Sequence, residues 1–449
     1  MKTWLVLPDP FSSRLFFDTG IVERMHRRLG DDLELFLLDA GEDAAAWRER
    51  ADDIPATVPE DLRDAALPLP ARVFRRTDRW LDRRIGFYPL SLRQSLRHGF
   101  NRSRMRPGHQ NWFLDPTLAG PVPRSLRIDP LLSRWHYGRL RYMPAALARR
   151  LKAERPAVAL ANIQMHAVVP YIVGARRLGL PVVGHVASWD HTVGKGIVAP
   201  GLQRYIVQNA VMRDDLVRYH GVDAARVVVT GWPQTDVFHR KRPRAEFDAL
   251  LRTLGVDAAR PVVLAMGNTP TNAPFEAQFV ERLVFWWREQ GERFSLLFRP
   301  HPRDRDWRTR FAAALAAEGV GVQEPSFTDI ETLAVLLQHG DCVVANAGTI
   351  LLDALVNDRP SVCVLYDEEA PAGESFALKN VSGEHYKALM ESGAFYRADR
   401  FEEVAAGIQR ALEQPGELRE ERARVAREVV GDVDGRAAER VVDAIVGAL

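Results

Sequence analysis

Residues 157–187 read AVALANIQMHAVVPYIVGARRLGLPVVGHVA, in which two apolar runs flank a stretch with helical spacing. The runs at 157–161 and 181–187 have the length and composition of buried strands. The stretch between them, 165–178, has the length of a helix. A strand, a helix and a further strand in this order are typical of a parallel sheet whose faces are covered by helices. These residues therefore predict an α/β fold.

The alternation of strands and helices continues on both sides of this stretch. Further apolar runs of strand length lie at 3–7, 33–38, 205–208 and 227–230. A second series begins at residue 261, and its strand-like runs are 261–266, 294–298, 342–345 and 361–366. Two such series predict two Rossmann-like doubly wound domains facing a central cleft, with the ligand at the carboxyl ends of the strands.

Domain boundaries follow from these two series. We predict an N-terminal domain over residues 1–238, a charged hinge over 239–260 and a C-terminal domain over 261–430. Residues 431–449 have helical spacing and predict a C-terminal helix that can cross back to the N-terminal domain.

The composition excludes several classes of protein. The chain has 449 residues, too many for one hydrophobic core, and its 46% hydrophobic content excludes a mainly disordered chain. Its two cysteines, Cys342 and Cys363, lie in apolar runs and predict buried thiols in a reducing compartment rather than a disulfide framework. The N-terminus lacks the cleavage site of a signal peptide, and no apolar run approaches the roughly 20 residues that span a bilayer. We therefore predict a cytoplasmic protein.

The net charge of +2 conceals a strongly basic segment at residues 71–150. This segment holds 18 arginines, no lysine and four acidic residues, so it carries +14 and the rest of the chain −12. Ten aromatic residues are interleaved with the arginines. This pattern predicts contact with an anionic membrane surface or a lipid-linked pyrophosphate, and we expect no nucleic-acid partner. A general preference for arginine, in a chain with six lysines, is the alternative explanation.

Three loops of the C-terminal domain carry polar residues directly after a predicted strand. In one of them, Gly348 permits close approach of the backbone to a ligand, and Thr349 adds a hydroxyl at the start of a helix. In another, two prolines fix a turn that holds a guanidinium and an imidazole, groups suited to a diphosphate. The alternatives are an ordinary turn with Thr349 as helix N-cap and a structural histidine bonded to backbone. The predicted donor-binding residues of these loops are Gly267, Asn268, Thr269, Arg299, His301, Asn346, Gly348 and Thr349.

The N-terminal domain offers a cluster of ionisable residues after the strand-like run 181–187. Asp190 or His191 can accept a proton from an acceptor hydroxyl, and Lys195 can hold an anion. Trp189 stands beside them. A turn of solvated charges is the alternative. We therefore predict Asp190 and His191 as catalytic residues, with Trp189 and Lys195 on the acceptor side.

Several kinds of site are excluded by missing motifs. The first strand is not followed by a Gly-x-Gly-x-x-Gly sequence, and the chain contains no Walker-type Gly-Lys-Ser/Thr. Cysteine or histidine pairs with zinc spacing and the Gly-x-Ser-x-Gly elbow are also missing. We therefore predict no cofactor and no metal, because a guanidinium and a helix N-terminus can neutralise a diphosphate.

Taken together, these loops resemble a GT-B glycosyltransferase, and more narrowly the branch of CDP-glycerol glycerophosphotransferases and related capsule and cell-wall transferases. The family's Trp-His-Gly-Thr-Pro-x-Lys loop is similar to residues 189–195, with Asp190 in place of the family's histidine. Its Arg-x-His-Pro motif occurs at 299–302. Its phosphate loop is similar to 346–353, which adds Asp353 to the donor-binding residues.

The resemblance implies a metal-independent glycosyltransferase. It would move a sugar from a nucleotide sugar, UDP- or CDP-linked or other, to a hydroxyl of a glycan or lipid-linked acceptor in surface polysaccharide or cell-wall synthesis. Asp367, after the last strand-like run, would bind the donor sugar. The enzyme would act in the cytoplasm, peripherally on the inner face of the membrane. The alternatives are a nucleotide-sugar 2-epimerase, a polyol-phosphate (glycerophosphate) transferase and a non-catalytic glycan-binding protein on the same scaffold.

Overall fold

The computed structural model describes residues 1–38, 44–58, 143–194, 198–326, 329–371, 375–381 and 385–449. The chain forms two compact units. Of the described residues, the first unit holds those up to Asp236 together with Gly431–Leu449, and the second unit holds Val237–Val430. Most of the basic segment 71–150, and Lys195, lie outside the described residues.

The first unit is built on a seven-stranded sheet in the order β3-β2-β1-β4-β5-β6-β7, and its described strand pairs are all parallel. The strands are β1 (Thr3–Leu7), β2 (Leu33–Leu37), β3 (Ala56–Thr57), β4 (Ala157–Leu160), β5 (Val182–His185), β6 (Arg204–Val207) and β7 (Val227–Val229). The helices are α1 (Pro10–Asp18), α2 (Ile21–Leu29), α3 (Ala44–Ala51), α7 (Ala145–Glu154), α8 (Val169–Arg177), α9 (His191–Gly194), α10 (Ala210–His220) and α22 (Ala437–Val446). Helix α11 (Gln234–His239) leads into the second unit.

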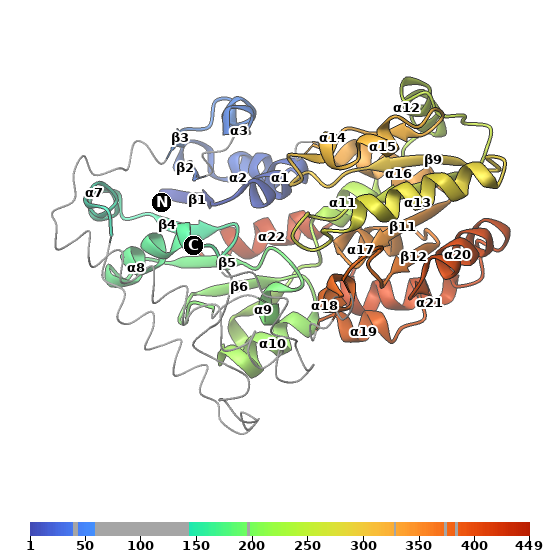
Figure 1. Cartoon of the computed structure of the whole chain (residues 1–449). Coiled ribbons are helices and arrows are strands. Elements are labelled where there is room, and N and C mark those ends of the chain that lie inside the picture. The colour runs from blue at the N-terminus through green and yellow to red at the C-terminus, as the bar shows by residue number, and fades with distance from the viewer. Residues whose placement is uncertain (39–43, 59–142, 195–197, 327–328, 372–374, 382–384) are drawn as a thin grey trace. The chain divides into compact units, whose positions relative to one another are not determined.

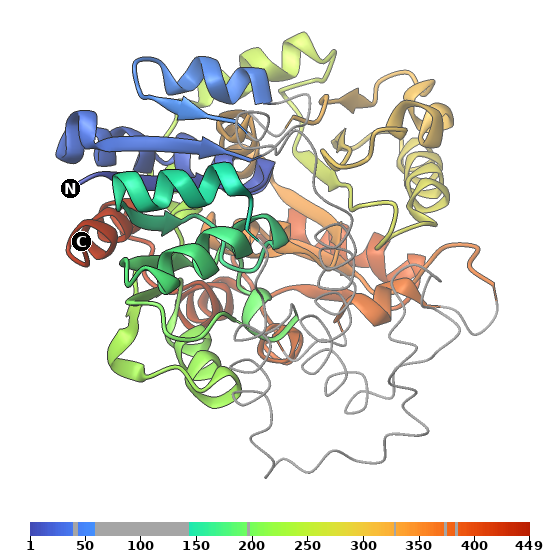
Figure 2. The same ribbon diagram turned by 90° about the vertical axis from the view of Figure 1, so that its left-hand side faces the viewer.

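The last helix, α22, completes the first unit. It packs beside α2 and β6, and both chain ends lie close together on this unit (Figure 1 and Figure 2). Its N-terminus is capped by Asp236, whose carboxylate accepts the N–H groups of Ala437 (3.0 Å) and Ala438 (2.7 Å). Val441, Val442 and Ile445 belong to the same hydrophobic core as the β-strands. The helix is therefore an integral part of the first unit.

The second unit is built on a six-stranded parallel sheet in the order β10-β9-β8-β11-β12-β13. The strands are β8 (Val262–Met266), β9 (Ser295–Arg299), β10 (Gly321–Val322), β11 (Cys342–Asn346), β12 (Ser361–Val364) and β13 (Tyr396–Ala398). The helices are α12 (Arg244–Thr253), α13 (Glu276–Glu289), α14 (Trp307–Arg310), α15 (Ala312–Leu315), α16 (Ile330–His339), α17 (Thr349–Val356), α18 (Phe376–Val381), α19 (Tyr386–Met390), α20 (Phe401–Glu413) and α21 (Arg419–Val425). A π-helical turn, Ala426–Val430, ends the unit.

The two units confirm the predicted α/β class and the two Rossmann-like domains. Strands such as β8 (Val262–Met266) are completely buried, because helices cover both faces of a parallel sheet. The thiols of Cys342 and Cys363 are free and buried on neighbouring strands, as predicted, and burial raises the pKa of both. The two-residue strands β3 and β10 were not predicted, because two residues carry no readable period.

The direction of winding reverses once in each sheet, between β1 and β4 in the first unit and between β8 and β11 in the second. Such a switch point separates the two following loops and is where doubly wound sheets bind ligands. In both units a hydrogen bond joins these loops. Asn162 donates to Asp9 (3.3 Å) in the first, and Asn268 donates to the Ala347 carbonyl oxygen (3.2 Å) in the second. Each sheet therefore presents an ordered polar switch point.

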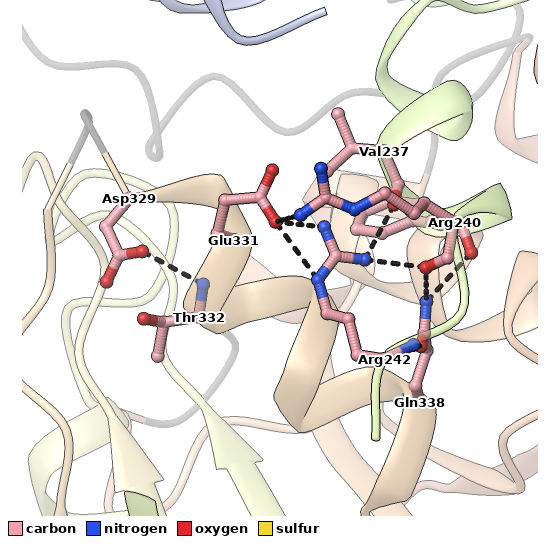
Figure 3. A network of polar contacts seen from close by, with 8 residues as sticks. Val237, Arg240, Arg242, Asp329, Glu331, Thr332 and Gln338 are labelled. Atoms are coloured by element: carbon pink, nitrogen blue, oxygen red, sulfur yellow. Dashed lines mark hydrogen bonds and ion pairs between the residues drawn. The ribbon is translucent and has the colours of Figure 1, made fainter. Parts of the chain in front are cut away.

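The start of the second unit is fastened to helix α16 by buried polar contacts (Figure 3). The guanidinium of Arg242 donates to the carbonyl oxygens of Val237 (2.8 Å) and Arg240 (2.9 Å) and also pairs with Glu331. The Gln338 side chain donates to the Arg240 carbonyl oxygen (2.9 Å) and accepts the Arg242 N–H (2.9 Å). The first part of the segment predicted as a hinge, up to residue 242, is therefore bonded to α16 within the second unit, and its role as a hinge stays a prediction. The rest of that segment forms α12.

Candidate functional site

The loop after β8 lies directly against the loop after β9. The Gly267 N–H donates to the Arg299 carbonyl oxygen (2.8 Å). A Cβ atom at Gly267 would stand 3.0 Å from the His301 nitrogen and 3.1 Å from the Pro300 Cα. A side chain at this position would force the backbone of the neighbouring loop to move by a few tenths of an ångström, so glycine favours this approach. Gly267 therefore brings two of the predicted donor loops together.

Asn268 joins the same loop to the one after β11. Besides the bond to the Ala347 carbonyl oxygen, its side-chain oxygen accepts the Thr269 N–H (2.7 Å) and its own N–H donates to the buried carboxyl of Glu276 (2.8 Å). The Asn346 side chain, which ends β11, is also buried, and its Oδ1 has no hydrogen-bond partner within the described part of the chain. All three predicted loops thus meet at one switch point.

Helix α17 begins at this point with its N-terminus open. Gly348 is the N-cap in an extended conformation, and no described side chain caps the helix. Thr349 occupies the first helical position, so the alternative in which Thr349 caps the helix is wrong. An uncapped N-terminus presents backbone N–H groups and the positive end of the helix dipole, both of which favour an anion.

Substitutions at two glycines distinguish a glycine that the packing of the loops requires from a glycine that gives a ligand access to the backbone. We expect Gly267→Ala to destabilise the second unit by about 1–3 kcal/mol, because its Cβ meets backbone atoms that are held by the sheet. Gly348→Ala meets nothing closer than 3.8 Å, so it should lose less than about 1 kcal/mol, as expected for alanine at an N-cap, while binding of a nucleoside diphosphate weakens. Thermal unfolding with and without the nucleotide measures both effects. Equal stability losses in the two variants would contradict this explanation.

Arg299 and His301 stand at the end of β9. Arg299 is buried and donates through Nε to the side-chain oxygen of Gln323. His301 accepts the Arg303 N–H at Nδ1 (3.0 Å), so the neutral ring carries its proton on Nε2. This backbone contact is the one expected for a structural histidine, and binding of a donor by Nε2 stays a prediction.

Two further predicted donor residues are engaged within the protein. Asp353 is buried inside α17, one turn after Thr349. Asp367 accepts the Ala377 N–H (3.0 Å) near the start of α18. Asp353 and Asp367 therefore lie outside the three loops after β8, β9 and β11, which carry the other predicted donor-binding residues.

In the first unit, Trp189, Asp190 and His191 follow β5 at its carboxyl end. Trp189 is buried, and Asp190, which is partly exposed, accepts a hydrogen bond from the Ser188 hydroxyl (2.5 Å). His191 begins α9, and its carbonyl oxygen accepts a bond from the Gln164 side chain (2.8 Å). Asp190 is therefore more exposed than His191, and the catalytic roles of both stay predictions.

The loop around these residues is held by a histidine that the sequence analysis did not identify. His220 accepts the Val198 N–H at Nδ1 (3.1 Å), so its neutral ring donates from Nε2 to the Thr192 carbonyl oxygen (2.7 Å). Burial lowers the pKa of His220 to about 4, which keeps the ring neutral. The two residues that His220 contacts, Thr192 and Val198, precede and follow residues 195–197 in the sequence. Since His220 belongs to an amphipathic helix 28 residues from Thr192, no local motif indicates this role.

A second missed residue, His185, ends β5. Its Nδ1–H donates to the Ala161 carbonyl oxygen (3.0 Å), and the ring edge faces Phe16 with centroids 5.6 Å apart. Burial lowers the pKa of His185 to about 4. Its Nε2 has no hydrogen-bond partner in the described residues. The only sequence signal was its place at the end of an apolar run.

Metal binding has no evident basis in the described residues. No group of three histidine, cysteine, aspartate or glutamate side chains is arranged there to hold an ion. The metal-independent chemistry stays a prediction.

Solved structures share this fold over nearly the whole chain. The UDP-GlcNAc 2-epimerase from Neisseria meningitidis bound to UDP-GlcNAc aligns over 100% of both chains, with 10% identity and a TM-score of 0.57. The UDP-GlcNAc 2-epimerase from Methanocaldococcus jannaschii also covers 100% of both chains, at 13% identity and a TM-score of 0.53. A glycosyltransferase from Rickettsia africae covers 99% of this chain and 98% of its own, at 10% identity and a TM-score of 0.52. At these identities the likeness shows the fold alone.

Sequence comparison identifies the family. No curated protein sequence matches the chain. The family model described as CDP-Glycerol:Poly(glycerophosphate) glycerophosphotransferase matches residues 201–447, which is more than half of the chain. The match begins after the loop with Trp189 and Asp190 and includes all three loops of the second unit and helix α22. The chain therefore belongs to the CDP-glycerol:poly(glycerophosphate) glycerophosphotransferase family.

Proposed function

We propose that this protein is a metal-independent glycosyltransferase of cell-wall or surface polysaccharide synthesis, which moves a sugar from a nucleotide sugar to a hydroxyl of a glycan or lipid-linked acceptor. Membership of the family makes it a transferase. The observation that carries the proposal is the switch point of the second unit, where three polar loops are fastened together in front of an uncapped helix. Such an arrangement suits the diphosphate of an activated donor.

The donor diphosphate would be neutralised by the protein itself. The N-terminal N–H groups of α17 would bind phosphate oxygens, with Gly348 allowing their approach. The guanidinium of Arg299 and the Nε2–H of His301 would donate to the leaving diphosphate as its negative charge increases. These donors are fixed before the reaction, so they would not need to reorganise in the transition state.

The acceptor would be activated in the first unit. Asp190 would take the proton of the acceptor hydroxyl as its oxygen forms a bond to the anomeric carbon. The bond from that carbon to the diphosphate oxygen would break, and its electron pair would leave with the nucleoside diphosphate. His191 is the alternative candidate for the general base. Trp189 and Lys195 are proposed to contact the acceptor.

Transfer of a polyol phosphate is the second candidate, and the family match favours it. In that reaction the acceptor oxygen would attack the phosphorus next to the polyol, and a nucleoside monophosphate would leave. The aspartate at position 190, where the family has a histidine, favours sugar transfer instead. The two reactions use the same diphosphate site and differ in the bond that breaks.

The released nucleotide distinguishes the candidates. A thermal-shift screen of nucleotides, nucleotide sugars and CDP-glycerol would first find the donor, since a ligand at about 100 times its Kd stabilises the protein by about 2.7 kcal/mol. With donor and acceptor, release of a nucleoside diphosphate supports sugar transfer, and release of a monophosphate supports polyol-phosphate transfer. Conversion of the nucleotide sugar without acceptor would point to a 2-epimerase. Failure of every nucleotide to bind would refute the proposal in favour of a non-catalytic glycan-binding protein.

The place of action is a further part of the proposal. No described helix is long and apolar enough to cross a bilayer. We propose that the enzyme works in the cytoplasm, peripherally on the membrane, and that the basic segment 71–150 contacts anionic lipid or a lipid-linked acceptor. The supporting observation is the +14 charge of that segment, and 71–142 lie outside the described residues.

A further inference from the structure

Two buried carboxyl groups and one partly buried guanidinium lie next to the donor loops of the second unit. Glu276 begins α13 and is 6% exposed, and Asp304, in the loop after β9, is 2% exposed. Arg310 ends α14, and its guanidinium pairs with the Asp304 carboxylate. Charged residues are rarely buried to this extent unless they are paired. None of the three belongs to the donor-binding residues discussed above.

The side chains of Glu276 and Arg310 hold the first donor loop, and Asp304 belongs to the turn of the neighbouring one. Both oxygens of the Glu276 carboxyl lie within hydrogen-bond distance of the Asn268 nitrogen (2.8 and 3.0 Å). Arg310 donates to the carbonyl oxygen of Ala273 (3.0 Å), at the other end of the same loop. The Asp304 N–H donates to the His301 carbonyl oxygen (2.8 Å) in the neighbouring loop. The cluster thus fixes the segment 268–273 at both ends and the turn at 301–304.

The cluster contains two carboxyl groups and one guanidinium, so its charge depends on one proton. Burial is the main reason why the pKa of Glu276 is raised to about 8. The hydrogen bond from the Asn268 N–H and the charge of Arg310 lower this pKa, and the nearby Asp304 carboxylate raises it. The Asp304 Oδ1 atom accepts no hydrogen bond from the described residues. Below this pKa a protonated Glu276 leaves the cluster neutral, and its carbonyl oxygen still accepts the Asn268 N–H. Above the pKa the cluster carries a buried charge of −1.

We propose that Glu276 is a positioning residue for the donor loop and that its ionisation weakens donor binding, because the cluster then places a negative charge behind the loops that bind the diphosphate. The inference rests on the proposed function for the identity of the ligand. Affinity for the donor is then full below about pH 8 and declines as the pH rises through that value. At an effective dielectric constant of about 20, one uncompensated charge roughly 12 Å from a charged ligand group corresponds to a loss of about tenfold in affinity once Glu276 is fully ionised.

The experiment compares Glu276→Gln with Glu281→Gln, an exposed residue of the same helix. Dissociation constants are measured by calorimetry from pH 6.5 to 9 with the diphosphate ester that binds in the screen, CDP-glycerol being suitable because its groups do not titrate in this range. Wild type and Glu281→Gln should lose about fivefold in affinity by pH 9, where Glu276 is about nine-tenths ionised, whereas Glu276→Gln should stay constant. An unchanged pH dependence in Glu276→Gln, or a flat profile in wild type, would overturn the inference.

A second measurement tests the positioning role of Glu276 without any ligand. Hydrogen exchange of the Asn268 amide reports its bond to Glu276 directly. In Glu276→Ala this amide should exchange at least tenfold faster, and in Glu276→Gln it should remain protected, because the amide oxygen can accept the same bond. Unchanged protection in Glu276→Ala would refute the positioning role. If no nucleotide binds but this result holds, the proposed function fails and the positioning role of Glu276 stands.

Discussion

Replacing Asp190 by Asn should lower kcat by about 10²–10⁴-fold, the usual contribution of a general base. Asn keeps the shape of the side chain and can still accept the bond from Ser188, so the loop should keep its structure. Binding of the nucleotide to the second unit should be unchanged. Steady-state kinetics with the identified donor and acceptor, and calorimetry with the donor alone, measure the two quantities.

The matched control is Asp214→Asn, on the exposed surface of α10 in the same unit. This variant should keep full activity. If Asp190→Asn also keeps full turnover, Asp190 is not the base, and His191→Asn becomes the decisive variant. If Asp190→Asn instead loses donor binding, the separation of donor and acceptor roles between the two units is wrong.

Replacing Arg242 by Met should destabilise the second unit by about 3 kcal/mol. Met keeps much of the apolar stem but removes the guanidinium that donates to Val237 and Arg240 (Figure 3). These carbonyl oxygens would then be left with fewer donors in a region where water has little access, which is the main source of the loss. For a unit of this size the Tm should fall by roughly 10 °C. Calorimetric unfolding measures the change.

Arg240→Met is the matched control, because Arg240 contacts the same Glu331 carboxylate (3.3 Å). The Arg240 side chain is 72% exposed, whereas that of Arg242 is 3% exposed. An exposed ion pair contributes about 0–1 kcal/mol, so the control should unfold almost as wild type does. Equal losses in the two variants would mean that the ion pair with Glu331, rather than the buried carbonyl contacts, holds the segment.

The fold was predictable because the buried strands of a parallel sheet appear in the sequence as continuous apolar runs. Val182–His185 and Val262–Met266 are completely buried, and their composition alone marks them as strands. Short edge strands such as Gly321–Val322 carry no such pattern, and their pairing comes from the neighbouring strand. The sequence therefore indicates the centre of each sheet better than its edges.

The sequence predicted only those candidate site residues that come directly after a strand, where ligands of such sheets bind. Asn268, Arg299 and Gly348 lie directly after apolar runs, and the switch point brings them together. The residues that hold these loops in place come from other parts of the chain. Glu276 and Asp304 are separated by 28 positions, and a charged residue at the start of a helix is normally read as solvated. Contacts of Glu276 and Asp304 with the loops form only when the sheet has folded, so no local sequence pattern predicts them.

The return of α22 to the first unit has a consequence for the synthesis of the protein. Residues 237–430 form one continuous segment, so the second unit can complete its core while the chain is still being made. The first unit begins earlier but lacks Val441, Val442 and Ile445 until residues 437–446 emerge from the ribosome. The unit that starts first in the chain is therefore the one that finishes folding last.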